Sequence, residues 1–132
     1  MFGIFKSKKI PFDKIETVIG GNTSFSGHLK SDGNIRIDGM CEDGTIEVVG
    51  NVLVSETGRV SAKIIAENVS VAGEVTGEIH AYGRLEIIGD GRVRGDVRVA
   101  NFYKDESAVL EGNLSMGEET GDESSAANGD SE

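Results

Sequence analysis

The sequence predicts an all-β fold: a single-stranded parallel β-helix, or solenoid, with three faces, about six coils and disordered termini. The first observation is a tripeptide, Gly/Ala-x-(Leu, Ile or Val), that recurs six times at nearly equal intervals. Its apolar members are separated by 17, 18, 15, 18 and 17 residues. This period is too short for a helical repeat unit but fits one turn of a solenoid. The six anchor residues are Leu29, Ile46, Ile64, Ile79, Val97 and Leu114.

A second ladder runs in the same phase and supplies the other strands of each unit. Asn34, Asn51, Asn68, Arg84 and Asn101 each precede an apolar residue, and alternating apolar residues follow them as in half-buried strands. A third apolar position comes four residues before most of the anchors, at Phe25, Val60, Val75, Val93 and Leu110. Each unit therefore contains three short apolar stretches, one for each face.

The corners between these strands are predicted from residue type. Glycine enters the positive-φ region without steric cost, and asparagine does so more often than most residues, so both are expected at sharp corners. The single proline, Pro11, lies outside the repeats, as a strand ladder requires. The spacing alone does not determine the handedness of the coil.

Composition divides the chain into three parts. Residues 1–16 are predicted to be a flexible N-terminal segment, residues 17–116 a β-helix domain, and residues 117–132 a disordered tail with six acidic residues and no basic one. The formal net charge of -10 argues against nucleic acid as a partner, since phosphates require a basic surface. With one cysteine, no membrane-span pattern and no secretory signal pattern, we expect a cytoplasmic protein.

The N-terminal nine residues place apolar side chains before three lysines. Such a segment can insert its apolar side chains into the bilayer interface while the lysines contact anionic lipid. We therefore expect a peripheral membrane anchor, although a frayed terminus with incidental apolar residues has the same composition. The candidate membrane-binding residues are Met1, Phe2, Ile4, Phe5, Lys6, Lys8 and Lys9.

Two positions depart from the repeat. One extra residue precedes the anchor at Ile46, so either Met40 or Cys41 must point inward across a bulge, and a small buried hydrophobe is the simpler role for the thiol. In the last unit, Lys104 stands where its counterparts are Ile or Val. The contact made by this last coil is therefore expected to differ.

Several stretches resemble the bactofilins, a family of polymer-forming bacterial cytoskeletal proteins. They are Thr17-Val18-Ile19-Gly20, Phe25-Ser26-Gly27-His28-Leu29, Ile35-Arg36-Ile37-Asp38-Gly39, residues 71–79 and residues 110–116. The resemblance covers residues 17–116. It implies a right-handed three-faced β-helix that assembles end to end into filaments without nucleotide, membrane attachment through the N-terminal segment on the inner face of the cytoplasmic membrane, and a scaffolding role for cell-shape or cell-organisation proteins that remain unidentified.

The residues also indicate a polymer by themselves, because a β-helix has two open ends with unpaired backbone groups and exposed core. No polar cap is evident beyond either end of the repeats, and stacking on another copy of the chain would cover both. The candidate polymerisation interface comprises Ile19, Phe25 and Leu29 at one end, and Val109, Leu110, Leu114 and Met116 at the other.

The sequence gives little support for other chemistry. His28 and His80 are three coils, or about 14 Å, apart, so we expect no shared metal site, and we assign no catalytic residue and no cofactor. There is no phosphate-binding loop of the G-x-x-x-x-G-K-(S/T) type. Two alternatives stay open: a trimer like the left-handed β-helix acyltransferases, suggested by glycines at six-residue spacing, and a monomeric solenoid that binds a partner protein on one face.

Overall fold

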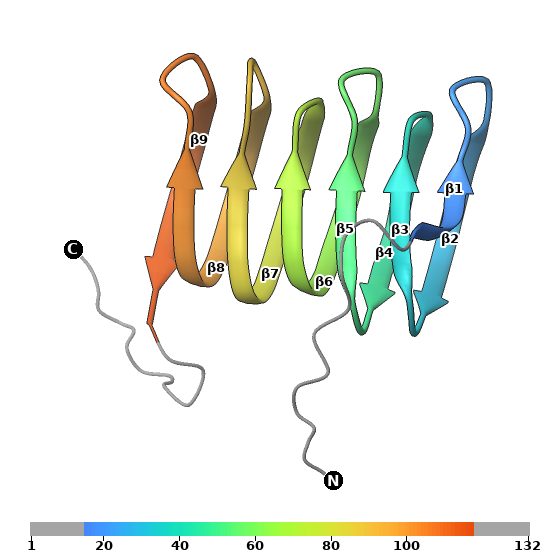
Figure 1. Cartoon of the computed structure of the whole chain (residues 1–132), viewed down its shortest axis with the longest axis horizontal. Coiled ribbons are helices and arrows are strands. Elements are labelled where there is room, and N and C mark those ends of the chain that lie inside the picture. The colour runs from blue at the N-terminus through green and yellow to red at the C-terminus, as the bar shows by residue number, and fades with distance from the viewer. Residues whose placement is uncertain (1–14, 118–132) are drawn as a thin grey trace, which may run out of the picture.

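A computed structural model of the chain describes residues 15–117, and these form one continuous parallel β-helix (Figure 1). Each strand pairs in parallel with strands of the adjacent coils, which confirms the predicted solenoid. The strands are β1 (Ile15–Ile19), β2 (Ser24–Ser31), β3 (Asn34–Ile37), β4 (Met40–Val48), β5 (Asn51–Val54), β6 (Arg59–Val71), β7 (Glu74–Ile87), β8 (Arg92–Lys104) and β9 (Val109–Met116).

The strands wind through three faces six times. Face 1 comprises β1, β3, β5 and residues 68–71, 84–87 and 101–104. Face 2 comprises residues 24–26, 40–42, 59–61, 74–76, 92–94 and 109–111, and face 3 comprises residues 28–31, 45–48, 62–66, 77–81, 95–99 and 112–116. The first strand begins at Ile15, which pairs with Asn34, two residues before the start predicted at residue 17.

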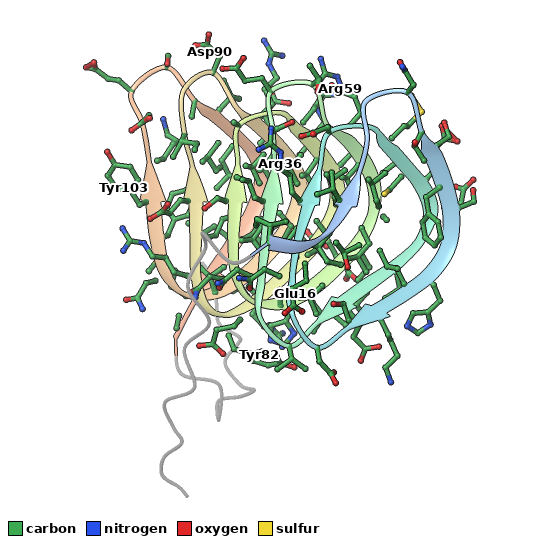
Figure 2. All side chains as sticks on the ribbon, turned by 45° about the vertical axis from the view of Figure 1, so that its right-hand side comes forward. Glu16, Arg36, Arg59, Tyr82, Asp90 and Tyr103 are labelled. Carbon is green, nitrogen blue, oxygen red and sulfur yellow. The ribbon has the colours of Figure 1, made fainter. Side chains whose placement is uncertain are left out.

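The core is a set of apolar columns that run along the rod axis. In one of these columns, Ile46, Ile64, Ile79 and Val97 stack in register and are buried. Neighbouring side chains on each strand alternate between this interior and solvent, as the pleat of a strand requires. Polar side chains such as Arg59 and Tyr103 stand on the outside (Figure 2). The alternation read from the sequence thus matches the buried and exposed sides of each strand.

Glycines form a column of their own where face 2 turns into face 3. Gly77, Gly95 and Gly112 have φ angles of 133°, 134° and 124°, in the region that disfavours residues with a Cβ atom. In addition, a Cβ atom on Gly95 would collide with the backbone oxygen of Gly77 in the preceding coil, and one on Gly112 would collide with that of Gly95. Glycine is therefore required here both by conformation and by close stacking.

The asparagines work differently from the prediction. Within residues 15–117, the positive-φ residue other than glycine is Asp43, so the corner asparagines do not adopt that conformation. Instead, the backbone N–H of Asn51 donates to Oδ1 of Asn34 (2.9 Å), and Nδ2 of Asn68 donates to Oδ1 of Asn51 (2.9 Å). Buried amide side chains thus bond from coil to coil, satisfying polar groups that would otherwise be costly.

The extra residue before Ile46 produces the predicted bulge. Cys41 is buried and occupies the core column of face 2, whereas Met40 is exposed. The register shifts between Glu42 and Gly44, and Asp43 between them has a φ of 52°. Burial raises the pKa of the Cys41 thiol, as expected for a thiol that serves as a small core residue.

Candidate functional site at the two ends of the rod

The first coil forms the N-terminal end of the rod and contains three of the predicted interface residues. Ile19 is 8% exposed, whereas Phe25 and Leu29 are partly buried and pack against the core cluster. The ring of Phe25 turns toward Gly27, since a Cβ atom on Gly27 would meet the ring at 4.0 Å. The N-terminal end of the core is thus largely covered by side chains of its own coil.

The last coil forms the C-terminal end and is more open. Leu114 and Met116 continue the two core columns of face 3 but are 39% and 55% exposed, because no further coil covers them. Leu110 packs partly against the core, while Val109 pairs with Arg92 in the outward-facing column of face 2. The four predicted residues therefore lie in one coil, but Val109 faces outward rather than along the apolar interior.

Within residues 15–117, a carbonyl of the last coil lacks the backbone partner that its counterparts have inside the rod. At the corner between faces 1 and 2, a carbonyl in each of the first five coils accepts the N–H of the next coil at 2.8–3.0 Å. The acceptors are the carbonyl oxygens of Thr23, Gly39, Gly58, Gly73 and Gly91, and the donors are the N–H groups of Met40, Arg59, Glu74, Arg92 and Val109. The equivalent carbonyl of the last coil belongs to Ala108, which has no next coil.

Lys104, which lies inside the last coil, donates to this carbonyl. It continues the column of Ile87, but its Nζ donates to the carbonyl oxygens of Ala108 (2.9 Å) and Asp105 (3.2 Å). Lys104 departs from the repeat in the sequence, but this role was not predicted for it. The signal was present: a lysine breaks an otherwise apolar column in the terminal coil.

Further hydrogen bonds tie the last corner to the coil before it. The carboxylate of Asp105 accepts the N–H of Gly89 (2.8 Å) and the hydroxyl of Tyr103 (2.8 Å), and the Ser107 hydroxyl donates to the carbonyl of Gly89 (2.8 Å). The Gly89 N–H and the Tyr103 hydroxyl hold the pKa of Asp105 below its ordinary value. These bonds hold the terminal corner to the coil that precedes it.

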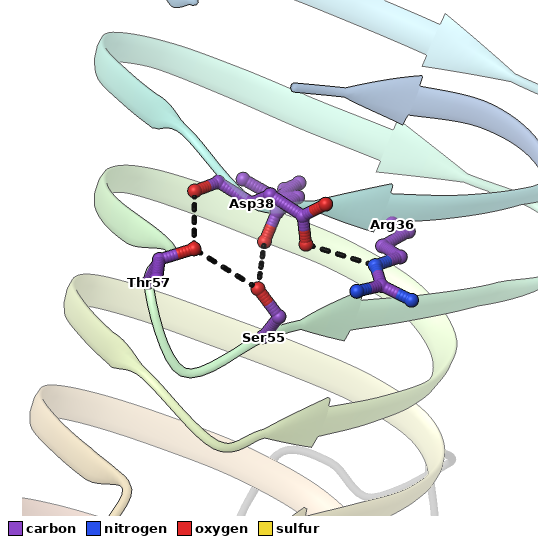
Figure 3. Close-up of polar contacts among 5 residues, drawn as sticks. Arg36, Asp38, Ser55 and Thr57 are labelled. Atoms are coloured by element: carbon purple, nitrogen blue, oxygen red, sulfur yellow. Dashed lines mark hydrogen bonds and ion pairs between the residues drawn. The ribbon is translucent and has the colours of Figure 1, made fainter. Parts of the chain in front are cut away.

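At a corner in the middle of the rod, a side-chain hydroxyl also donates to a carbonyl of the preceding coil (Figure 3). The hydroxyl of Thr57 donates to the carbonyl of Asp38 in the preceding coil (2.7 Å), as Ser107 does at the last corner. Nε of Arg36 donates to the Asp38 carboxylate (2.8 Å), and the Ser55 hydroxyl and the Arg36 guanidinium keep the pKa of Asp38 low. At this corner the Arg59 guanidinium also donates to the carbonyls of Gly58 (2.8 Å) and Glu56 (3.1 Å), so Lys104 differs by its place in the last coil and in an apolar column.

The other predicted features lie elsewhere. The candidate membrane-binding residues, at positions 1–9, are outside the described residues. Nε2 of His28 contacts Oε1 of Glu47 at 3.1 Å, and His80 stacks on Tyr82, so the two histidines are engaged separately. Residues 15–117 contain no group of three or more potential metal ligands, nor a helix long and apolar enough to cross a bilayer.

Comparison with known proteins shows one family. The family model described as "Bactofilin: Polymer-forming cytoskeletal" matches residues 17–115, which is nearly the whole coiled region. Two bactofilins of Myxococcus xanthus are similar to this chain. BacO is 31% identical over 115 residues, covering 83% of this chain and 90% of BacO, and BacP is 30% identical over 102 residues, covering 77% of this chain but 42% of BacP.

Two solved structures have the same fold. A solid-state NMR structure of the cytoskeletal bactofilin BacA aligns with a TM-score of 0.70 and 27% sequence identity, covering 76% of this chain and 95% of that one. A cryo-EM reconstruction of double helical filaments of Thermus thermophilus bactofilin aligns with a TM-score of 0.68 and 28% identity, covering 77% of this chain and all of that one.

Proposed function

The chain belongs to the bactofilin family of polymer-forming cytoskeletal proteins, and on that premise we propose that it assembles end to end into filaments without nucleotide. The observation that carries this proposal is the pair of incomplete ends. Leu114 and Met116 expose core positions at one end, and the strands of both terminal coils have a free edge. A coil of another copy would bury the apolar positions and pair the free edges.

We further propose that the filaments lie on the inner face of the cytoplasmic membrane and position cell-shape or cell-organisation proteins. The support is the apolar and lysine-rich sequence of residues 1–9, whose charge opposes that of the rest of the chain. The acidic rod and tail would be repelled by anionic lipid, so binding through the N-terminal segment would leave them free for other proteins.

End-to-end assembly is tested by placing a charge at an open end. Leu114→Arg should abolish pelletable filaments, because stacking would bury the guanidinium without a partner. Val49→Arg is the matched control, since Val49 is 65% exposed on the side of the rod, and this variant should assemble like the unmodified chain. Negative-stain microscopy and sedimentation decide the result. Filaments formed equally by both variants, or an unmodified chain found as discrete trimers or monomers, would contradict the proposal.

Membrane attachment is tested separately with vesicles. The full chain should float with vesicles containing anionic lipid and less with neutral vesicles, and a chain lacking residues 1–9 should stay in the bottom fraction with both. Because filaments can pellet alone, the assay uses flotation, with Leu114→Arg as a non-assembling background. Equal flotation of the full and shortened chains would exclude the anchor.

A further inference from the structure

The terminal corner at Lys104 presents hydrogen-bond groups that a stacked coil would need. The column that runs through this position is apolar in the coils before it, at Ile19, Ile37, Val54, Val71 and Ile87, and ends in lysine. The side chain is exposed, and its ammonium group donates to two backbone carbonyls of the terminal corner.

One of these carbonyls has a defined role in the repeat. The Ala108 oxygen is the sixth member of the series whose first five members accept an N–H from the next coil. Lys104 Nζ bonds it at 2.9 Å, within the 2.8–3.0 Å range of those backbone bonds. At an interior corner, the Gly58 carbonyl accepts both the Glu74 N–H (3.0 Å) and the Arg59 guanidinium (2.8 Å), so a cationic donor can share such a carbonyl with the next coil. Lys104 differs from Arg59 because it stands at the end of an apolar column that an added coil would continue.

We propose that Lys104 is a built-in cap that opposes the addition of a further copy of this chain to the C-terminal coil. This inference rests on the proposed end-to-end assembly. An added coil that continues the ladder must either enclose the ammonium group within the stack or move it out of the corner. If the ammonium group stayed, it would be enclosed next to the apolar Ile87 column, where an unpaired charge is strongly disfavoured.

The cap covers one part of the end and leaves the rest open. Lys104 closes the corner between faces 1 and 2, whereas Leu114 and Met116 on face 3 remain exposed. The free energy of adding a copy at this end therefore has two opposing contributions. Burial of the apolar side chains favours addition, and the enclosure or release of Lys104 opposes it. The cap raises the concentration needed for assembly rather than preventing it.

The experiment compares critical concentrations for filament formation by sedimentation. Lys104→Met keeps most of the stem but removes the ammonium group, and the critical concentration should fall about tenfold, as expected when bonds from a charged donor need not be broken. Lys104→Ile, which extends the apolar column, should lower the critical concentration to a similar degree. Lys104→Arg should keep the critical concentration within about twofold of that of the unmodified chain, since a charged donor remains. Thermal unfolding of each variant checks that the rod is intact.

The matched control is Lys63→Met, which makes the same chemical change on the side of the rod. Lys63 lies in β6, away from both ends, and pairs with Glu78 at 3.7 Å. Its critical concentration should not change by more than about twofold, because an exposed pair contributes little. An equal decrease in Lys63→Met and Lys104→Met would show a general charge effect and overturn the cap.

The outcomes separate this inference from the proposed function. If the unmodified chain, Lys104→Met and Lys104→Ile assemble at the same concentration, end-to-end assembly stands and the cap is wrong. Assembly of the Lys104 variants alone would support the cap and show that it blocks the unmodified chain under those conditions. If none of them assembles, both proposals fail, because removal of the cap then releases nothing.

Discussion

The two ends of the rod are built from the same repeat but are closed differently. At the N-terminal end, Ile19 is nearly buried and the ring of Phe25 lies across the first coil. At the C-terminal end, Leu114 and Met116 are exposed, and Lys104 bonds the free carbonyl of the corner. A solenoid can therefore reduce the cost of an open end either with a large apolar side chain or with a charged donor.

This difference indicates what each end requires from a neighbour. The N-terminal end already covers much of its apolar surface, so stacking there gains mainly strand pairing. Stacking on the C-terminal end buries more apolar surface on face 3. It must also enclose or release Lys104 at the corner between faces 1 and 2. The following predictions test this contrast, beginning with the largest expected effect.

The glycine column should respond differently at its end and in its middle. Gly95→Ala combines a φ of 134° with a collision against the Gly77 backbone, and should lower the free energy of unfolding by about 3 kcal/mol or more. Gly27→Ala has a φ of 123° but open space on the side of the missing coil, and should cost about 1–2 kcal/mol. Urea unfolding measures both, and equal losses would refute the close stacking of coils at Gly95.

Truncation of core side chains should show which end is better packed. Phe25→Ala is expected to cost about 2–3 kcal/mol, whereas Leu114→Ala should cost about 1 kcal/mol, because the leucine is 39% exposed already. Unfolding by urea must be followed below the assembly concentration. A larger loss for Leu114→Ala than for Phe25→Ala would reverse the comparison of the two ends.

A lysine at the N-terminal end of the Lys104 column should be less well accommodated. Ile19 occupies the first position of that column and is 8% exposed, so Ile19→Lys should lower stability by about 1–2 kcal/mol, with the stem reaching around the open end. The matched control is Val18→Lys, the exposed neighbour, which should be nearly neutral. If both changes are neutral, the N-terminal end is as open as the C-terminal one.

Acid should weaken the hydrogen bonds that the Asp105 carboxylate accepts at the terminal corner. Hydrogen bonds from the Gly89 N–H and the Tyr103 hydroxyl lower the pKa of Asp105 in the folded state. Because the pKa is lowered, the ionised Asp105 carboxylate contributes fully to folding stability above its unfolded pKa of about 4. This contribution is lost as the pH falls through the folded pKa. The amide signal of Gly89 should therefore shift below about pH 4, and Asp105→Asn should remove that transition. A Gly89 signal that does not respond to acid would contradict the bond.

The repeat made much of the fold predictable because each anchor has its counterpart one coil away. Ile64 and Ile79 stack in register as their spacing indicated, and Cys41 takes the inward position at the bulge. The role of the corner asparagines was not predictable from conformational preference alone, because Asn34 and Asn51 act through side-chain bonds between coils. Such bonds depend on which residues the winding brings together.

For the candidate site, the sequence placed the candidate interface residues in the first and last coils, since these are the ends of the repeat. The sequence alone determined the strand period, the corner glycines and the place where the repetition stops, because all three are local consequences of backbone conformation and side-chain alternation. Only the tertiary structure decided that Phe25 covers one end while Lys104 bonds Ala108 at the other. Those contacts depend on the directions of side chains at an unpaired edge, where no neighbouring coil constrains them and the repeat pattern carries no information.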